Sequence, residues 1–455
     1  MRHHDLVVIG AGSGNAVIDD SFADLDVAIV EERWFGGTCL NAGCIPSKML
    51  TYTAHVARTV REAGAYGVDA ELRAVRWREV RDRVFTRLDA EREDGRTYRE
   101  QQEWVTLYEG RARFTGPRTL RIDRVDGPVD VSAGQIVVAA GGRPLVPGPV
   151  LDAGLPYETS DTIMRIDAPP RHLAILGGGY IAAELADVFA GTGSSVTIVE
   201  KEEQLLGPQD ETVRERFTDL ARPRYDLRLG REVTAVGGRP GGLRLTLDGG
   251  STVEADALLV AVGRVPNSDR LDLEAAGIAT HDDGRVIVDA HQRTTAEGVF
   301  ALGDICSPVP LKHVANREAK VVAHNLRHPD DLIAADHDLV PAAVFTRPQI
   351  ASVGATEQEC RDSGLDYQVG TAGYGDIAYG WAMEDTTGFC KVLAEPRTGR
   401  LLGAHLMGEQ APTLIQPLVL AATLGIDATT LTKSPYWIHP ALTEVVENAL
   451  LDLGL

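Results

Sequence analysis

Residues 172–189 read HLAILGGGYIAAELADVF, and the apolar run VTIVE that follows them ends at Glu200. The order is strand, glycine turn, helix, second strand and acidic residue, which is the βαβ unit that binds dinucleotides. The turn glycines allow a pyrophosphate to approach the N-terminus of the helix. Glu200 lies 23 positions after Gly177, close to the roughly 20 expected for the residue that contacts the ribose.

A second unit of this kind stands at the N-terminus. Residues 5–15 read DLVVIGAGSGN, about ten residues of helical character follow, and the strand VAIVE ends at Glu31, 21 positions after Gly10. Asn15 occupies the place where a third Gly or Ala is usual, so the helix–strand packing must accommodate a larger side chain. One glycine-rich turn is a weak signal, but two complete units in one chain predict two dinucleotide sites.

The rest of the pattern predicts an α/β fold with two Rossmann-like domains and a C-terminal α+β domain. Strands run into turns at VVAAGGRP (137–144) and LVAVGRVPN (259–267), on either side of the second unit, and again at VFALGDICS (299–307). These exits indicate that the second domain interrupts the first. We therefore expect domain segments at 1–148, 149–266, 267–337 and 338–455, with C-terminal helices near 415–424 and 441–450.

Composition excludes several classes of function. The chain has 455 residues, enough for roughly three domains. Its formal net charge of −21 argues against nucleic acid as a partner, because phosphate binding needs a basic face. No apolar run approaches the ~20 residues that span a membrane, and nothing resembles a secretion signal. We expect a cytoplasmic protein with no membrane partner.

Two of the five cysteines lie close together in FGGTCLNAGCIPSK (residues 35–48). In a cytoplasmic protein such a pair more often binds metal or performs redox chemistry than forms a structural disulfide. A zinc site needs two more ligands, which no further CxxC or paired-His motif supplies, and two inert thiols are the other alternative. A reversible disulfide of Cys39 and Cys44 is favoured, with no metal. Cys44 begins a helix, whose first amides stabilise a thiolate and lower its pKa.

With these motifs the chain resembles the FAD-dependent pyridine nucleotide–disulfide oxidoreductases, a family that includes glutathione reductase and lipoamide dehydrogenase. The resemblance covers nearly the whole length, through GAGSGN, GGTCLNAGCIPSK, GGGYIAAE, AVGRVPN, FALGD and HPALTEVVENALL. It implies that the first domain binds FAD, the second binds NADH or NADPH, and the third forms a homodimer with shared active sites.

The resemblance also implies roles for single residues. Cys44 would face the flavin, while Cys39 would attack the substrate disulfide. Lys48 and Glu184 would form an ion pair beside the flavin, although either could instead be a helix-surface residue. The implied FAD contacts are Gly10, Gly12, Ser13, Gly14, Glu31, Gly37, Thr38, Lys48, Gly141, Gly303 and Asp304. The implied coenzyme contacts are Gly177, Gly179, Tyr180, Ile181, Glu184, Glu200 and Gly263.

His439 is the acid–base that the resemblance implies, acting in the active site of the partner subunit. Glu444 follows five residues later, within the first turns of a helix that Pro440 can open. A carboxylate in this position holds the imidazole tautomer and stabilises its cation.

The coenzyme and the substrate remain separate questions. Glu200 is followed by Lys201, Glu202 and Glu203, which favours NADH, because a carboxylate accepts from the ribose 2′-OH and repels a 2′-phosphate. Residues 374–388 (YGDIAYGWAMEDTTG) and 436–451 (YWIHPALTEVVENALL) are most similar to members that reduce mycothiol disulfide, the oxidised form of a cysteinyl pseudodisaccharide thiol. A lipoamide dehydrogenase that reduces NAD is the alternative, and a flavin-binding redox sensor without turnover is a remote one.

Overall fold

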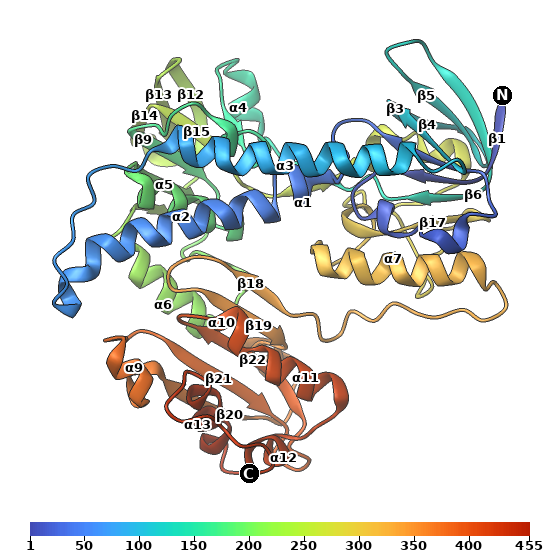
Figure 1. The fold of residues 1–455 in the computed structure, drawn as a ribbon. Helices are drawn as coiled ribbons and strands as arrows, with labels where there is room; N and C mark the ends of the chain where they lie inside the picture. The colour runs from blue at the N-terminus through green and yellow to red at the C-terminus, as the bar shows by residue number, and fades with distance from the viewer.

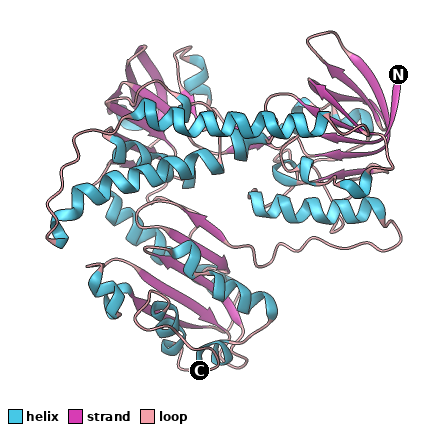
Figure 2. Cartoon of the chain, in the orientation of Figure 1, coloured by secondary structure: helices cyan, strands magenta, loops and turns pink.

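The computed structural model describes all 455 residues. Three large sheets with their helices form three bodies. The long helix α3 (Trp77–Glu100) runs from the second body across to the first, and α2 (Cys44–Glu62) packs against both α3 and the second body (Figures 1 and 2). None of the helices combines the length and the apolar character needed to cross a membrane.

The first sheet is mainly parallel and buried. β1 pairs in parallel with β2 and β6, and its residues Leu6, Val7 and Val8 are fully buried. The strands are β1 (Arg2–Ile9), β2 (Val27–Glu31), β3 (Val105–Glu109), β4 (Arg111–Gly116), β5 (Thr119–Asp123), β6 (Val129–Val138) and β17 (Val299–Ala301). Helix α7 (Lys312–Arg327) packs against this sheet through Ala319 and Val322.

The helix expected after the first glycine turn is absent, so this part of the prediction is wrong. Two 3₁₀ turns, Gly14–Ala16 and Asp20–Phe22, stand there instead. Asp19 has an extended backbone, and its side chain accepts from Ser21 N at 2.9 Å, which starts a new turn. Arg99 of α3 donates to the carbonyl oxygens of Asn15 and Ile18 at 2.9 and 2.8 Å. In a longer helix these two carbonyl oxygens would accept from backbone N–H groups, but here they accept from the Arg99 side chain instead.

Asn15 itself faces the same arginine. Its side-chain oxygen accepts from Arg99 Nε at 2.8 Å. The close helix–strand packing that normally requires a third glycine is not formed here. Asn15 can therefore occupy this position, where its side chain binds the buried Arg99 guanidinium.

The second unit has the predicted strand–helix–strand order. Five parallel strands form its sheet: β8 (Glu158–Thr159), β9 (His172–Leu176), β10 (Ser195–Glu200), β11 (Asp226–Leu229) and β15 (Ala257–Val260). Helices α5 (Tyr180–Thr192) and α6 (Glu211–Ala221) share a core with one face of this sheet. The antiparallel strands β12 (Val233–Arg239), β13 (Gly242–Leu247) and β14 (Thr252–Ala255) share another core with the second face. Gly177 has φ 109°, and a Cβ there would lie 2.4 Å from Ala261 O.

The chain enters and leaves this second body through adjacent strands. Strand β7 (Gly142–Pro144) pairs antiparallel with β16 (Arg264–Pro266). Strand β17 then pairs with β6, so the first sheet is completed by residues that follow the second body in sequence. The short helix α4 (Gly148–Asp152) follows β7 in sequence, whereas the short helix α1 (Gly37–Asn41) directly precedes α2.

The C-terminal body is an antiparallel sheet with helices. Its strands are β18 (Ala342–Val344), β19 (Ile350–Gly354), β20 (Gln368–Gly373), β21 (Phe389–Ala394) and β22 (Leu401–Met407). Its helices are α8 (Glu357–Asp362), α9 (Ala378–Ala382), α10 (Ala411–Leu414), α11 (Gln416–Leu424), α12 (Ala428–Lys433) and α13 (Glu444–Asp452). The last helix starts three residues later than expected, and Pro440 lies outside it, because the Glu444 carboxylate turns back to accept from Ala441 N.

A single apolar core crosses the boundaries between the bodies. It contains Leu50 of α2, Phe85 of α3, Phe189 of α5, and both Phe389 and Met407 of the C-terminal sheet. The close approach of α2 and α5 depends on Gly191, because a Cβ there would lie 2.6 Å from the Cβ of Ala54. Through this core α2 and α3 are packed against both the second and the third body.

Candidate active site

One cavity of about 930 Å³ lies where the three bodies meet. This volume is near the upper end of the about 300–1,000 Å³ that is typical of small-molecule sites. Its lining comes from all three bodies, as Gly12, Cys44, Glu184, Asp304 and Phe345 illustrate.

The first glycine turn forms a backbone-lined passage into this cavity. Gly37 has φ 65°, and a Cβ there would lie 2.7 Å from Gly12 Cα, so two glycine backbones face each other. At the end of β2, Glu31 accepts from Ala11 N at 2.8 Å and from Arg33 N at 2.8 Å. Burial raises the pKa of Glu31. Two facing glycine backbones, with a carboxylate at the end of the neighbouring strand, fit the pyrophosphate and ribose of a dinucleotide such as FAD.

Other sequence-predicted residues for this cofactor lie around the same space. Asp304 follows β17, and burial raises the pKa of its carboxyl, with Arg264 Nε 4.0 Å away. The cavity is lined by Gly10, Gly12, Ser13, Glu31, Gly37, Thr38, Lys48, Gly141, Gly303 and Asp304. Gly14 is the one member of this set that does not line it, since it is buried with its Cα facing Ala139 and Val8.

The second glycine turn has a corresponding arrangement. Gly178 N donates to the Glu200 carboxylate, which also accepts from Glu202 N at 3.0 Å. Gly177, Glu200 and Gly263 lie at the carboxyl ends of β9, β10 and β15, where ligands of parallel sheets bind. Tyr180 and Ile181 begin α5 and line the large cavity, as does Glu184, whereas Gly177, Gly179, Glu200 and Gly263 lie outside it.

The two cysteines lie at the junction of α1 and α2 and open into the cavity. The side-chain contact with Cys39 lowers the pKa of Cys44 to about 7, assisted by the charges of Lys48 and Lys312. The same contact raises the pKa of Cys39 far above its ordinary value. Because Cys44 is the first residue of α2, the helix terminus also favours its thiolate. Near neutral pH Cys44 is therefore about half ionised, and its thiolate predominates at higher pH, while Cys39 remains a thiol.

Lys48 lies one helical turn after Cys44 and is held by a buried acid. Its Nζ is 2.8 and 2.6 Å from the two carboxylate oxygens of Glu184. Phe345 of the C-terminal body donates its backbone N–H to Glu184 at 3.0 Å, and its ring lies 4.5 Å from Lys48 Nζ. The predicted ion pair is thus present, and the third body covers it.

Lys312 is a cavity residue that sequence reasoning missed. It is the first residue of α7, and its Nζ donates to Ser13 Oγ at 2.9 Å across 299 positions of sequence. The available signal was that it is one of few lysines in an arginine-rich chain and begins a helix just after the FALGD motif. A cation at a helix N-terminus adds to the positive potential of the amides there.

His439 and Glu444 form a pair that is separate from the cysteines within one chain. His439 Nδ1 lies 2.7 Å from Glu444 Oε1, and this contact lowers the pKa of Glu444. The His439 side chain is 70% exposed, and neither residue lines the cavity.

Two glycine turns of the dinucleotide-binding type and a reactive thiol pair in one chain define a disulfide oxidoreductase of the flavoprotein class. Residues 4–319 match the family described as pyridine nucleotide-disulphide oxidoreductase, and residues 340–450 match its dimerisation domain. The chain belongs to this family. It is therefore an oxidoreductase that acts on sulfur groups with FAD and a nicotinamide coenzyme, and the dimerisation domain supports a homodimer.

Relatives cover the whole chain. It is 50% identical over 462 residues to mycothione reductase of Mycobacterium tuberculosis, with all of both chains covered. It is 35% identical to dihydrolipoyl dehydrogenase of Halobacterium salinarum, covering 98% of this chain and 95% of that one. Among solved structures, the Cu(II) complex of the HOCl-induced flavoprotein disulfide reductase RclA from Escherichia coli has a TM-score of 0.87 at 26% identity, covering 99% of each chain. The fold class and the family predicted from sequence are confirmed.

Proposed function

We propose that the chain reduces mycothiol disulfide to mycothiol with electrons from NAD(P)H, in the cytoplasm. The observation that carries this proposal is the 50% identity to a mycothione reductase over the full length of both chains. In this proposal residues 1–148 and 267–337 hold FAD, residues 149–266 hold the coenzyme, and residues 338–455 form the dimer interface.

FAD, when bound, supplies the route by which two electrons pass from the nicotinamide to the cysteine pair. The turn at Gly10–Gly14 and Glu31 would hold its pyrophosphate and adenosine end. Thr38, Lys48 and Asp304 would hold the other end, in the cavity that these side chains line. Lys48, fixed by Glu184, places a positive charge beside this end.

The reduced cysteine pair then exchanges with the substrate. His439 of the partner subunit takes the proton of Cys39, whose thiol is otherwise too weakly acidic to ionise. The Cys39 sulfur attacks the substrate disulfide, so a Cys39–substrate disulfide forms and one mycothiol thiolate leaves. His439 returns its proton to that thiolate, while Glu444 stabilises the imidazolium. The Cys44 thiolate then attacks Cys39, which restores the Cys39–Cys44 disulfide and releases the second mycothiol.

For the coenzyme we propose a preference for NADH. The Glu200 carboxylate is fixed by two backbone amides at the end of β10, where it meets the ribose 2′-OH and opposes a 2′-phosphate. Lys201, the adjacent cation, lies 3.7 Å from Glu202, so its charge is partly neutralised. We expect kcat/KM for NADH to exceed that for NADPH, and the reverse order would overturn this preference.

The substrate is tested by comparing two reactions of one preparation. We expect NADH oxidation with mycothiol disulfide to exceed NAD reduction by dihydrolipoamide at least tenfold in kcat/KM. The opposite ratio would assign the chain as a lipoamide dehydrogenase, the alternative that Glu200 favours. Turnover with neither substrate by flavin-containing protein would favour a redox sensor.

The shared active site is tested by complementation. We expect Cys39→Ser and His439→Gln homodimers each to lose disulfide reduction. A differentially tagged heterodimer of the two chains then contains one doubly altered site and one unaltered site, if the sites are shared. We expect about half of the wild-type activity, whereas sites formed within one chain would leave the heterodimer inactive.

A further inference from the structure

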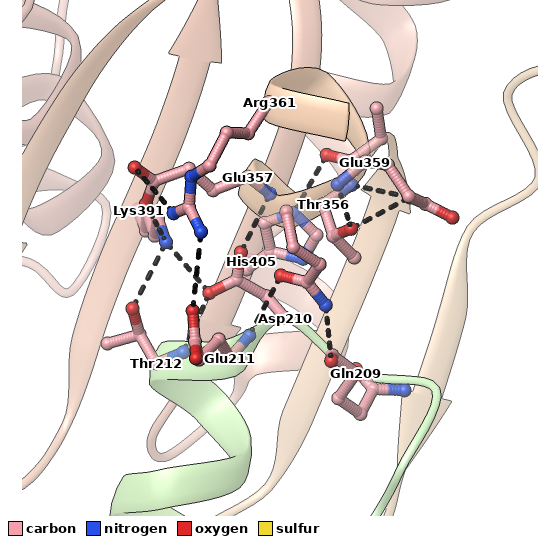
Figure 3. Close-up of polar contacts among 12 residues, drawn as sticks. Gln209, Asp210, Glu211, Thr212, Thr356, Glu357, Glu359, Arg361, Lys391 and His405 are labelled. Carbon is pink, nitrogen blue, oxygen red and sulfur yellow. Dashed lines mark hydrogen bonds and ion pairs between the residues drawn. The ribbon is translucent and has the colours of Figure 1, made fainter. Parts of the chain in front are cut away.

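A buried lysine joins the second body to the third. Lys391 lies in the middle of β21, and its side chain is 3% exposed. Its Nζ is 2.8 Å from Asp210 Oδ1, 2.7 Å from Glu357 Oε2 and 3.0 Å from Thr212 Oγ1 (Figure 3). All three ammonium donors have partners, as the burial of a charge requires.

Asp210 serves two helices from two bodies at once. It caps α6, where Oδ1 accepts from Thr212 N at 3.0 Å, and Oδ2 accepts from Glu357 N at 3.0 Å, the first amide of α8. Asp210 is fully buried. Burial alone would raise the pKa of Asp210, but Lys391 and the Glu357 amide hold it below its ordinary value. The carboxylate is therefore charged at neutral pH.

The third body also holds the residues on either side of Asp210. Gln358 of α8 donates through Nε2 to Gln209 O at 3.2 Å and accepts from Glu211 N at 3.2 Å. Three consecutive residues of the second body, 209–211, are thus fixed by α8 and β21.

Helix α8 is itself firmly placed. Its N-cap Thr356 forms a reciprocal capping box with Glu359. His405, the cross-strand neighbour of Lys391, has Nε2 3.0 Å from Ala355 O, just before this cap. The Asp210–Lys391 cluster (Asp210, Thr212, Glu357, Lys391 and His405) therefore joins the start of α6 in the second body to the hydrogen-bonded start of α8 and two paired strands of the third (Figure 3).

The loop that ends at Asp210 begins at Glu200 and passes over the second glycine turn. Leu206 is buried with φ 60° and donates its N–H to Gly178 O at 2.8 Å, while Gly178 N donates to Glu200. Gln209 N donates to Leu206 O at 2.8 Å, and Gln209 lines the large cavity. A continuous hydrogen-bonded path therefore links Asp210 to the backbone of the glycine turn.

Stability alone is a weak reason for such a cluster. A buried ion pair gains little over apolar residues of similar shape, because desolvation offsets the attraction. What the charges provide is a fixed geometry, since Asp210 accepts from Lys391, Thr212 and Glu357 at the same time.

We propose that Lys391 and Asp210 are positioning residues for the nicotinamide coenzyme. They fix the loop 201–209, and through Leu206 the Gly178 turn, against the dimerisation domain. Coenzyme affinity then depends on how the third body sits on the second, while the exchange chemistry at the cysteines does not. This inference rests on the proposed function, because that proposal assigns the coenzyme to the Gly177–Glu200 unit.

The test uses full-length protein containing FAD and three variants. Lys391→Met leaves Asp210 charged and unpaired, so it lowers both thermal stability and coenzyme affinity. The double variant Asp210→Asn/Lys391→Met removes both charges; Asn still caps α6 through its oxygen, but its NH2 group cannot accept from Glu357 N. Arg361→Met is the matched control, because it removes an exposed cation 3.7 Å from Glu357 and 3.9 Å from Glu211, at the rim of the cluster.

Binding of NAD⁺ and NADP⁺ to the oxidised protein is measured by calorimetry, together with Tm, flavin content and steady-state kinetics. We expect the double variant to recover most of the Tm that Lys391→Met loses, yet to bind the coenzyme about tenfold more weakly than the wild type, which corresponds to the loss of one ordinary hydrogen bond. Its KM for the coenzyme rises accordingly, and its kcat stays within about twofold. The control binds as the wild type does.

Two results would overturn the inference. Coenzyme affinity that recovers together with Tm in the double variant would show that the cluster is only structural. Failure of the wild-type protein to bind either coenzyme would overturn the proposed function, and this inference with it. The two failures are distinguishable, because the first leaves wild-type binding intact.

Discussion

Replacing Lys48 with methionine tests the electrostatic basis of the reactive thiolate. The substitution removes a positive charge that, together with the contact to Cys39, lowers the pKa of Cys44 to about 7 in the native protein. It also leaves Glu184, buried and negative, with only the Phe345 amide as a partner. Both changes disfavour a thiolate one turn away, so the pKa of Cys44 rises.

The size of the effect follows from the charge that is lost. An opposite charge near an ionisable group shifts its pKa by about one to three. Cys44 is a thiolate only when the pH exceeds its pKa. The native Cys44 therefore reacts at half its maximal rate near pH 7, and the variant does so at about pH 8 or above. A more basic thiolate is also about threefold more nucleophilic for each step of one in pKa. At pH 6 the variant has about tenfold fewer Cys44 thiolates than the native protein, each about threefold more nucleophilic, so it reacts about threefold more slowly. At high pH, where both thiols are ionised, the variant reacts about threefold faster.

The assay is the rate of iodoacetamide alkylation of the two-electron-reduced enzyme between pH 5.5 and 9.5, with Cys44 identified by peptide mass spectrometry. Lys48→Arg keeps the charge and retains a midpoint near pH 7. Lys433→Met, at the end of α12, is the control for loss of a remote lysine. If Lys48→Met leaves the midpoint in place, or if Lys48→Arg moves it equally, the charge of Lys48 does not set the reactivity of Cys44.

Three further substitutions test other parts of the site. Arg99→Met removes the hydrogen-bond donor of the Asn15 and Ile18 carbonyls, so we expect urea unfolding to show about 2–4 kcal/mol less stability. We also expect a flavin fluorescence titration to show weaker FAD binding. Unchanged stability and unchanged FAD affinity would refute this role of Arg99. Gly37→Ala places a Cβ 2.7 Å from the Gly12 backbone and should weaken FAD binding at least about tenfold, whereas Gly67→Ala, at a similar φ in open space, should not. His439→Gln should lower kcat/KM for mycothiol disulfide by about 10²–10⁴. The loss should be much smaller for a disulfide whose leaving thiol has a low pKa, because that thiol departs as a thiolate and needs no proton. Equal losses for the two substrates would exclude proton donation by His439.

The sequence predicted most of the fold, because its signals are local. Glycine turns, strand periodicity and the acidic residues Glu31 and Glu200 identify each βαβ unit within about 30 residues. The helix start at Cys44 was likewise visible from its own neighbourhood. The helix expected after Gly14 failed for a non-local reason, since Arg99, 84 positions later, takes the carbonyl of Asn15.

The parts of the site that could not be predicted depend on long-range contacts. Lys312 and Ser13 are 299 positions apart, and neither residue type announces the other. Lys391 lies in a strand that reads as an ordinary apolar run with one charge, which would suggest exposure. Its burial follows from Asp210, 181 positions earlier, in another body. A single sequence holds no local signal for such a pairing.

The pairing of β17 with β6 has a consequence for how the protein is made. Residues 299–301 are synthesised after the entire second body, yet they complete the sheet that starts at the N-terminus. The inserted body is contiguous in sequence, so a growing chain can finish it first. Asp304 and Lys312 emerge later still, and both line the cavity in which we propose that FAD binds. We therefore expect the chain to acquire its yellow colour only once these residues have been made, and chains truncated before residue 300 to remain colourless.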